Sequence, residues 1–267
     1  MLGAIIGDII GSIYEWDPYK STEFPLFSDN CIPTDDSMMT AAVAQALMDT
    51  YGKSDEEILQ ALIRCMKSWG LLYPGAGYGA SFNAWLRSDG TEPYNSFGNG
   101  SAMRVSSVGW LYPTLEETLH MAKLTADVTH NHPEGEKGAM AVAAAIFMAR
   151  NGSSKEEIKE YIEKTFGYDL NREVGLIRLF YQFDVSCQGS VPEAIICFLE
   201  GNSFEEAVRL AVSLGGDADT QAAIAGSIAE AFYGIPDEIV SAAQHFIPEP
   251  MKEQVERFNK FKLNKAL

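Results

Sequence analysis

Two clusters of carboxylate and hydroxyl side chains stand far apart in this sequence. One is Thr34-Asp35-Asp36. The other consists of Asp217, Asp219 and Thr220, at the end of the segment 215–220, Gly-Gly-Asp-Ala-Asp-Thr. Each cluster directly precedes an apolar run with helical spacing, so its oxygen atoms would gather at a helix N-terminus. Acids in that position either cap the helix and complement its dipole or bind a hard cation. For the second cluster alone, the two explanations are about equally good.

The presence of both clusters favours a metal site over capping. Asp35 and Asp36 are adjacent and repel each other unless an opposite charge compensates them. A cation shared with Asp217 and Asp219 would relieve the repulsion in both clusters. Oxygen-only ligation is typical of magnesium, manganese or calcium, whereas zinc is disfavoured because neither cluster contains His or Cys. The candidate metal ligands are Thr34, Asp35, Asp36, Asp217, Asp219 and Thr220.

Two glycine-rich loops indicate a second kind of binding. Residues 73–79 (Tyr-Pro-Gly-Ala-Gly-Tyr-Gly) and 95–102 (Asn-Ser-Phe-Gly-Asn-Gly-Ser-Ala) each precede an expected helix. Such loops present backbone N–H groups to phosphates, although turns use glycine as often. Together with a metal site, the two loops favour a ligand that carries phosphates. Arg104, just after the second loop, can pair with a phosphate or with a neighbouring carboxylate.

For four other polar residues, the sequence alone does not decide between a structural role and contact with a ligand. Asp8 interrupts a small-residue face, and we expect it to be buried and to bind neighbouring backbone. Glu15 lies at the end of the same segment, where a lone glutamate is usually solvated. His130 and His132 stand beside Pro133, so a structural turn and a contact to a ligand are equally compatible with them.

Helical periodicity covers most of the chain, and no run alternates as a strand would. Gly3, Gly7 and Gly11 are spaced four apart, which favours a face that another helix can approach closely. The expected fold is all-α: one domain over residues 1–267, a compact orthogonal bundle of roughly a dozen helices. The segments expected to be helical are 2–15, 38–49, 54–69, 81–86, 103–111, 114–127, 134–150, 153–166, 191–199, 203–214, 217–233 and 237–246. Residues 167–188 give no clear pattern, and the basic stretch 259–265 resembles a fraying end.

Composition limits the function classes. The formal charge of −17 argues against binding DNA or RNA duplexes, so an anionic ligand would need bound cations or helix N-termini. The four cysteines show no metal-binding spacing and suggest free thiols in a reducing compartment. No apolar run is long enough to span a membrane, and the N-terminus lacks the basic flank of a signal peptide. We therefore expect a cytoplasmic protein.

Six motifs, in order along the chain, resemble those of the ADP-ribosylglycohydrolase family, which includes dinitrogenase-reductase-activating glycohydrolases and ADP-ribosyl-acceptor hydrolases. A single motif would be weak evidence, but the set spans nearly the whole chain. The matching segments are 7–15 (Gly-Asp-Ile-Ile-Gly-Ser-Ile-Tyr-Glu), 34–36, 77–79, 97–104 (Phe-Gly-Asn-Gly-Ser-Ala-Met-Arg), 129–135 (Thr-His-Asn-His-Pro-Glu-Gly) and 215–220.

The resemblance implies an all-α hydrolase with two divalent cations, usually Mg²⁺ or Mn²⁺, at the base of an ADP-ribose cleft. The family's metal ligands match the six candidates named above, and its early glutamate matches Glu15. Family positions that contact the diphosphate and riboses match Gly79, Ser96, Phe97, Gly98, Asn99, Gly100 and His130. The aromatic residue that stacks on adenine varies in the family, and Phe97 and Phe82 are the candidates here.

The reaction implied by the resemblance breaks the bond between C1 of the distal ribose and an acceptor atom, through an oxocarbenium-like transition state. Cations would bind the ribose hydroxyls and lower the pKa of a water, and Glu15, Asp35 or Asp219 would act as the base. The brevity of the chain leans toward an arginine or guanidine acceptor. Two alternatives stay open: a catalytically silent protein that binds ADP-ribose, and a two-metal phosphohydrolase that acts on a nucleotide.

Overall fold

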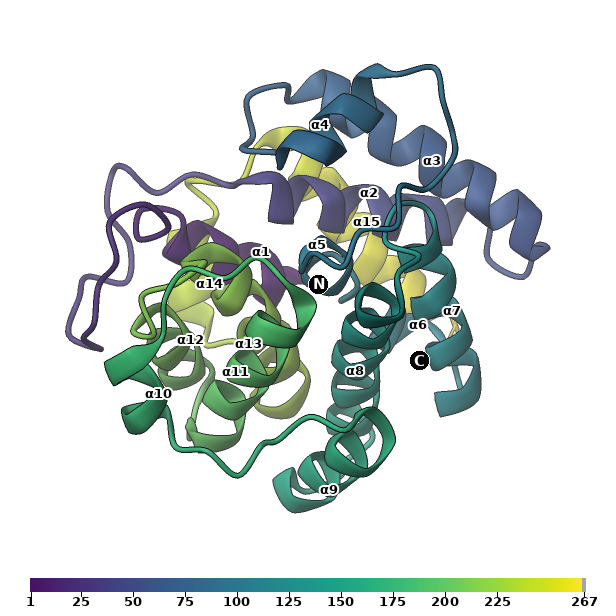
Figure 1. Ribbon diagram of the computed structural model, residues 1–267. Coiled ribbons are helices and arrows are strands. Elements are labelled where there is room, and N and C mark those ends of the chain that lie inside the picture. The colour runs from purple at the N-terminus through teal and green to yellow at the C-terminus, as the bar shows by residue number, and fades with distance from the viewer. Residues whose placement is uncertain (266–267) are drawn as a thin grey trace.

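The computed structural model describes residues 1–265, and within them the chain is built from α-helices without a β-strand (Figure 1). The fold class predicted from the sequence is therefore confirmed. The helices are α1 (Leu2–Gly11), α2 (Asp35–Asp49), α3 (Asp55–Leu72), α4 (Ala80–Arg87), α5 (Gly100–Met103), α6 (Val108–Leu111), α7 (Leu115–Asp127), α8 (Pro133–Arg150), α9 (Lys155–Phe166), α10 (Val174–Phe180), α11 (Cys187–Glu200), α12 (Phe204–Val212), α13 (Ala218–Tyr233), α14 (Asp237–Ala243) and α15 (Glu249–Lys265).

Helix α13 packs against α1, α8, α11 and α12, and it is closest to α1. The glycine face predicted on α1 is the reason. A methyl group added at Gly3, Gly7 or Gly11 would collide with the backbone of α13 at Gly226, Ala222 and Ala218–Asp219 respectively. The two helix backbones are therefore in contact, which brings the acids of α1 and α13 together.

Four predictions on the elements need correction. The helix expected over 2–15 ends at Gly11, and residues 12–15 already belong to the irregular segment that follows. The helix expected over 103–111 is two short helices, because residues 104–107 leave the helical path and Arg104 ends α5. Residues 167–188 contain α10 and the first turn of α11, which Ser186 begins by accepting a hydrogen bond from Gly189 N. The stretch 259–265 is not a frayed end, because it continues α15, whose Met251, Val255 and Phe258 are buried one turn apart.

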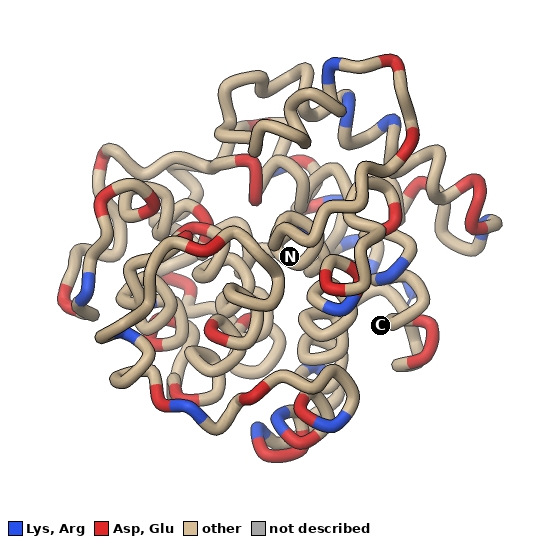
Figure 2. Tube along the Cα trace, in the orientation of Figure 1, with Lys and Arg blue, Asp and Glu red and all other residues tan. Residues whose placement is uncertain are grey.

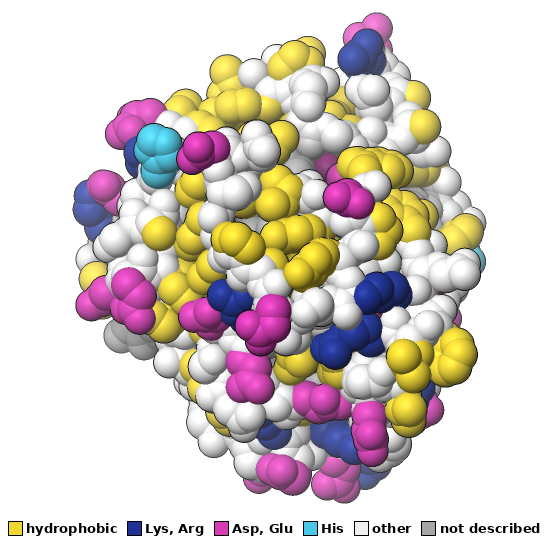
Figure 3. Space-filling view, turned by 90° about the vertical axis from the view of Figure 1, so that its left-hand side faces the viewer, with side chains coloured by type: hydrophobic (Ala, Val, Ile, Leu, Met, Phe, Trp, Pro, Cys, Tyr) yellow, Lys and Arg dark blue, Asp and Glu magenta, His cyan; other side chains and the backbone are white. Residues whose placement is uncertain are grey.

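A long irregular segment, residues 12–34, joins α1 to α2 along the left of Figure 1. Arg209 holds it at Thr22 and Phe24, donating to both carbonyl oxygens, and its guanidinium lies 4.8 Å from the Phe24 ring. Figure 3 views the molecule from this side and shows many hydrophobic side chains among acidic and basic ones. The segment places Glu15 and Trp16 at the end of α1 near the N-terminus of α13.

Acidic residues outnumber basic ones, 37 to 20, and Figure 2 shows them on most parts of the tube. The four cysteines are free thiols, three of them buried, as the sequence predicted. Among the helices of the described residues, none combines the length and the apolar character that crossing a membrane requires.

Candidate active site

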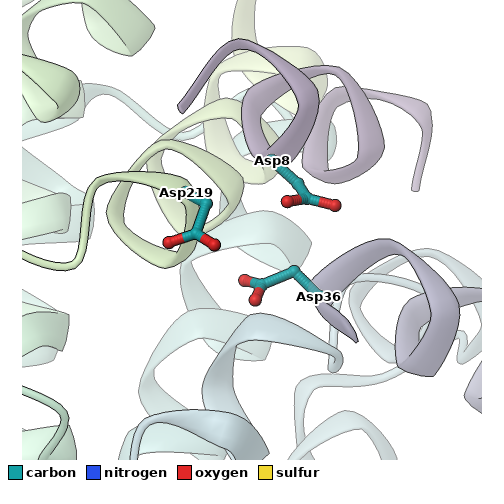
Figure 4. Close-up of side chains that lie close together, drawn as sticks. All are labelled: Asp8, Asp36 and Asp219. Carbon is teal, nitrogen blue, oxygen red and sulfur yellow. The ribbon is translucent and has the colours of Figure 1, made fainter. Parts of the chain in front are cut away.

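Three aspartates from three helices lie close together: Asp8 from α1, Asp36 from α2 and Asp219 from α13 (Figure 4). Asp36 and Asp219 also line a cleft. One carboxylate oxygen from each lies within 4.8 Å of the others, and all three side chains are buried. Asp219 belongs to a second group of the same size with Glu15 and Asp217. The two acidic clusters of the sequence thus meet in space, and Asp219 stands between two groups of oxygens.

The structure shows which of these residues caps a helix. Thr34 caps α2, because its hydroxyl accepts from Asp36 N at 3.4 Å. Asp217, at the N-cap position of α13, makes no side-chain cap and instead accepts from Asn99 Nδ2 at 2.6 Å. Asp36 Oδ1 is buried with no hydrogen-bond partner in the described chain. A buried carboxylate oxygen without a donor is costly, and a cation would satisfy it.

Asp8 has the structural role that the sequence predicted, since its carboxylate binds the start of α2. It accepts hydrogen bonds from Thr34 N at 2.9 Å, Thr34 Oγ1 at 2.6 Å and Ser37 N at 3.0 Å, with the Ser37 hydroxyl as a further donor. These bonds fix α2 against α1. They also place the Asp8 charge beside Asp36 and Asp219, so Asp8 adds to the negative field of the site.

Burial raises the pKa of every carboxyl group here, and for all but Asp219 the charge of a neighbouring carboxylate raises it further. For Asp8 and Glu15 the pKa is raised to about 7, first by burial and then by the charge of Asp219. Burial is also the main cause for Asp35, Asp36 and Asp217, whose pKa values lie well above the ordinary one, again with Asp219 next. The pKa of Asp219 is raised by burial, while bonds from its neighbours lower it. Carboxyl groups gathered in this way favour a cation at their centre.

The residues fit a divalent metal site by their donor set, their burial and the unpaired Asp36 Oδ1. The oxygens near the centre come from carboxylates and hydroxyls, which is the donor set of Mg²⁺ and Mn²⁺. The groups that could hold an ion are Asp8, Asp36 and Asp219, and Glu15, Asp217 and Asp219. Asp35 belongs to neither group but lines the same cleft.

The cleft above the acids has a volume of about 350 Å³, and most of the residues predicted from the sequence line it. Those at its wall are Glu15, Asp35, Asp36, Gly79, Ser96, Gly98, Asn99, Gly100, His130, Asp217, Asp219 and Thr220. Two predicted residues are not at its wall. Thr34 is buried beneath it against Asp8, and Phe97 lies outside, half-exposed, with its ring 5.5 Å from that of His132. Phe82, the other candidate for stacking on adenine, does line the cleft.

Steric constraints explain why two glycines precede Asp217. Gly215 has a φ of +65°, a left-handed conformation that costs little only for glycine. A methyl group at Gly216 would collide with the Tyr181 ring. Lys20 Nζ donates to Leu214 O and Tyr181 O at 2.5 and 2.6 Å, which ties the turn to the 12–34 segment. The turn that presents Asp217 and Asp219 is thereby held on both sides.

The wall of the cleft also holds a buried positive charge. Arg104 is 1% exposed, and within residues 1–265 no carboxylate lies within 4.0 Å of its guanidinium. Its Nη2 donates to Thr125 O and Thr129 Oγ1, while Nε has no partner in that part of the chain. Burial lowers its pKa to about 10, which still leaves it charged. The carboxylate pairing considered from the sequence is not made.

The structure distinguishes His130 from His132. His132 is the N-cap of α8 and accepts from Glu134 N at 3.1 Å, so its role is structural. His130 lines the cleft, 4% exposed, beside Gly98 and Gly100. Burial, and then the charge of Arg104, lower its pKa well below the ordinary value. The sequence could not assign different roles to the two histidines, because both stand just before the same proline.

The cleft wall includes residues to which the sequence gave no role, among them Trp16, Tyr94, Phe183 and Val185. Phe183 and Val185 come from the segment without a clear pattern. Asn99 N donates to Val185 O at 2.7 Å and Cys187 N to Phe97 O at 2.9 Å, which ties this segment to the glycine loop. The signal that could have located it is Ser186, whose hydroxyl caps α11 as serine does at many helix starts.

Comparison with known proteins gives a consistent picture. The sequence model of the ADP-ribosylglycohydrolase family matches residues 1–266. The chain is 25% identical over 335 residues to mouse ADP-ribosylhydrolase ARH3, covering 97% of this chain and 86% of that protein. It is 28% identical over 264 residues to the ADP-ribosylarginine hydrolase Tri1 of Pseudomonas putida, covering 88% and 70%.

A solved structure described as an ADP-ribosylglycohydrolase-related protein complex superposes with a TM-score of 0.70 at 24% identity. The match covers 98% of this chain and 95% of that one. At this identity the likeness concerns the fold.

Proposed function

The chain belongs to the ADP-ribosylglycohydrolase family and is a hydrolase that acts on ADP-ribosyl glycosidic bonds, and from this premise we propose that it removes ADP-ribose from arginine or guanidine groups with the help of two divalent cations. The observation that carries the proposal is the arrangement of carboxylates around Asp219 at the base of the cleft. We also propose that residues 1–267 form one domain, which the match of the family model over 1–266 supports.

The two ends of the cleft suggest how ADP-ribose would lie in it. Within the loop 96–100, Ser96, Gly98 and Asn99 already donate their backbone N–H groups to protein atoms. The donors left for the diphosphate are Gly100 N, the His130 ring and Gly79 N, beside the positive charge of Arg104, so the diphosphate would bind there. The distal ribose would then reach the acidic end. Thr34, Asp36, Asp217, Asp219 and Thr220, with Asp35 beside them, would hold Mg²⁺ or Mn²⁺ ions. When bound, these ions would polarise the ribose hydroxyls and lower the pKa of a water molecule.

In the proposed reaction, the oxygen of a water bonds to C1 of the distal ribose while the bond from C1 to the acceptor nitrogen breaks. The water loses one proton to a carboxylate, and the departing guanidine takes one up. Glu15 and Asp35 suit the role of base because they lie at the cleft wall and are only partly buried, whereas Asp219 is buried. The surrounding carboxylates would stabilise the positive charge that develops on the ribose.

Two observations favour a guanidine acceptor. Six carboxyl groups surround the site, Asp8, Glu15, Asp35, Asp36, Asp217 and Asp219, and they outnumber the four positive charges of two divalent cations. The excess negative charge would attract a cationic acceptor. In addition, Trp16 directly follows Glu15 and lines the cleft with its side chain 79% exposed, its ring stacked on Phe183 at 5.3 Å. A guanidinium stacks well on such a face.

The test is to incubate the chain and Mg²⁺ with arginine-linked and serine-linked ADP-ribosyl peptides and to identify the products by mass. We expect free ADP-ribose and unmodified peptide, with the arginine-linked peptide cleaved faster. Binding of ADP-ribose without release from either peptide would instead indicate a silent protein. Release of AMP, with the glycosidic bond intact, would indicate a phosphohydrolase. Faster cleavage of the serine-linked peptide would leave the hydrolase and overturn the acceptor assignment.

A further inference from the structure

Three polar side chains form a hydrogen-bonded chain inside the wall of the cleft. Arg104 Nη2 donates to Thr129 Oγ1 at 2.9 Å, and Thr129 Oγ1 lies 2.7 Å from His130 Nδ1. Arg104 is 1% exposed, Thr129 0% and His130 4%. Because these groups are buried, a proton in this chain that has no acceptor is costly.

The direction of each hydrogen bond follows from the protons that the groups carry. A guanidinium can only donate, so Thr129 Oγ1 accepts from Arg104. The Thr129 hydroxyl then has its own proton to donate, and in the described chain its other partner is His130 Nδ1. If Nδ1 carried a proton instead, the buried hydroxyl proton would have no acceptor. The hydroxyl of Thr129 therefore donates to Nδ1.

An accepting Nδ1 leaves the imidazole with a single proton, on Nε2. A doubly protonated ring would need Nδ1 as a donor, which the Thr129 hydroxyl does not allow. The Nε2 atom has no hydrogen-bond partner among residues 1–265. It faces the glycine loop, since a methyl group added at Gly100 would lie 3.1 Å from it and one at Gly98 3.5 Å. His130 thus holds an unused N–H donor at the cleft wall.

We propose that Arg104 and Thr129 are positioning residues that hold His130 as the neutral Nε2–H tautomer, ready to donate to an anionic oxygen of a ligand beside residues 96–100. This rests on the proposed function for the identity of that oxygen, which would belong to the diphosphate of ADP-ribose. A ring free to change tautomer would instead present the lone pair of Nε2, which repels the same oxygen. The hydrogen bonds to Arg104 and Thr129 remove that state before the ligand binds.

The tautomer is measured directly by long-range ¹H–¹⁵N correlation spectra of the free protein. The signals of His130 are identified among the four histidines by their loss in the His130→Gln variant. We expect a pyridine-type Nδ1 and a pyrrole-type Nε2 in the wild type. In Thr129→Val the hydroxyl is absent, and we expect signals of both tautomers. In Thr129→Ser the hydroxyl is kept, and the wild-type pattern should return.

Binding of ADP-ribose supplies the second measurement. Loss of a fixed, charge-assisted hydrogen bond costs ~10-fold in affinity, so Thr129→Val should raise the Kd and the KM about tenfold with a smaller change in kcat. Thr125→Val is the matched control. Thr125 is equally buried one turn earlier, and its hydroxyl bonds to Ala122 O rather than to His130. We expect Thr125→Val to leave the tautomer and the Kd unchanged, which separates the effect from loss of a buried hydroxyl.

A pyrrole-type Nδ1 in the wild type, or a Thr129→Val variant with an unchanged tautomer, would overturn the proposal. So would equal losses of affinity in Thr129→Val and Thr125→Val. The spectra need no substrate, and they therefore report on this inference whatever the chain hydrolyses. Conversely, a wild-type chain that hydrolyses no ADP-ribosyl bond would overturn the proposed function and leave the tautomer as measured.

Discussion

Two parts of the cleft wall carry opposite charges: an acidic end around Asp219, and a loop end with Arg104 and residues 96–100. Asn99 joins them, because its Nδ2 donates to Asp217. At the acidic end, Asp8, Asp36 and Asp219 meet within 4.8 Å of one another. At the other end, Arg104 is buried and has no carboxylate partner within the described chain. Each end is therefore expensive to bury on its own, because an unpaired charge loses its hydration without gaining a counterion.

The two ends also differ in how they are built. The acids are brought together by contact between helix backbones, since α1 and α13 meet along glycines. The donors are presented by loops: residues 96–100 and the turn that carries Thr129 and His130. Rigid helices suit a site where several ligand atoms must converge, whereas loops expose N–H groups. The difference supports the proposal that the acidic end binds cations and the loop end an anion, as hydrolysis of an ADP-ribosyl bond with two metal ions would need.

The largest expected effect comes from the residue shared by both acidic groups. Asp219→Asn removes one charge from each group with little change of shape. Bound metal ions contribute several kcal/mol to transition-state stabilisation, so we expect turnover to fall ~10³-fold or more. Without metal, the variant should be at least as stable as the wild type, because repulsion within the cluster is reduced. Activity assays, metal titration calorimetry and urea unfolding measure the three quantities.

Asp29→Asn makes the same chemical change on an exposed loop residue and is the control. It should keep wild-type turnover and metal affinity. If Asp219→Asn kept full activity in metal-depleted buffer, the acidic end would not be a metal site, and the comparison of the two ends would fail.

The acidic end also predicts how stability depends on pH. Carboxyl groups whose pKa is about 7 in the folded chain, such as Asp8 and Glu15, bind protons that the unfolded chain has already released above pH 4. The free energy of unfolding of the metal-free protein should therefore decrease as pH rises from about 4 to 7, by roughly a few kcal/mol. Saturating Mg²⁺ should remove or reverse this decrease, because it binds the deprotonated form.

Thermal unfolding at several pH values, with chelator and with Mg²⁺, measures the effect. The slope should be shallower in Asp219→Asn than in the wild type. If the metal-free protein instead became steadily more stable up to pH 7, the pKa values of these carboxyl groups would not be raised in the folded protein.

The sequence predicted the cleft residues that stand in short motifs better than the isolated ones. Thr34, Asp35, Asp36, Asp217, Asp219 and Thr220 are adjacent within short motifs, so local spacing was enough to select them, although their roles stay predictions. Arg104, Trp16 and Phe183 are single residues whose environment is made by segments distant in the sequence. The cleft wall around them is closed by contacts between distant segments, such as those of Val185 with Asn99 and of Phe97 with Cys187. No local sequence pattern predicts these contacts.

The same reasoning explains which helices were predicted. Long amphipathic helices with capping residues, such as α3 and α9, are visible because Ser54 and Ser154 each form a capping box. The seven-residue α10 and the four-residue α5 and α6 lie below the length at which periodicity is informative. No helix was predicted over 249–258, and 259–265 was taken for a fraying end, because the charges of α15 mask a buried stripe of Met251, Val255 and Phe258.

A smaller effect is expected from Gly7→Ala, which disturbs the helix contact and removes no charge. The added methyl group collides with the Ala222 carbonyl of α13. We expect a loss of about 1–3 kcal/mol in the free energy of unfolding and a weaker metal affinity, because Asp8 and Asp219 move apart. Gly175→Ala in α10 is the control, since a methyl group there meets no atom within 4 Å. It should be neutral or slightly stabilising.

The smallest effect tests which end of the cleft the acceptor leaves from. If the guanidine of the substrate stacks on Trp16, then Trp16→Ala should raise the KM for the arginine-linked peptide by roughly twofold to fivefold, as expected for an exposed cation–π contact. Trp16→Phe should restore most of the loss. The Kd for free ADP-ribose should not change, because it carries no guanidine. A weaker Kd for ADP-ribose in Trp16→Ala, with equal losses on arginine-linked and serine-linked peptides, would place part of the nucleotide beside Glu15, and the assignment of the two ends would have to be reversed.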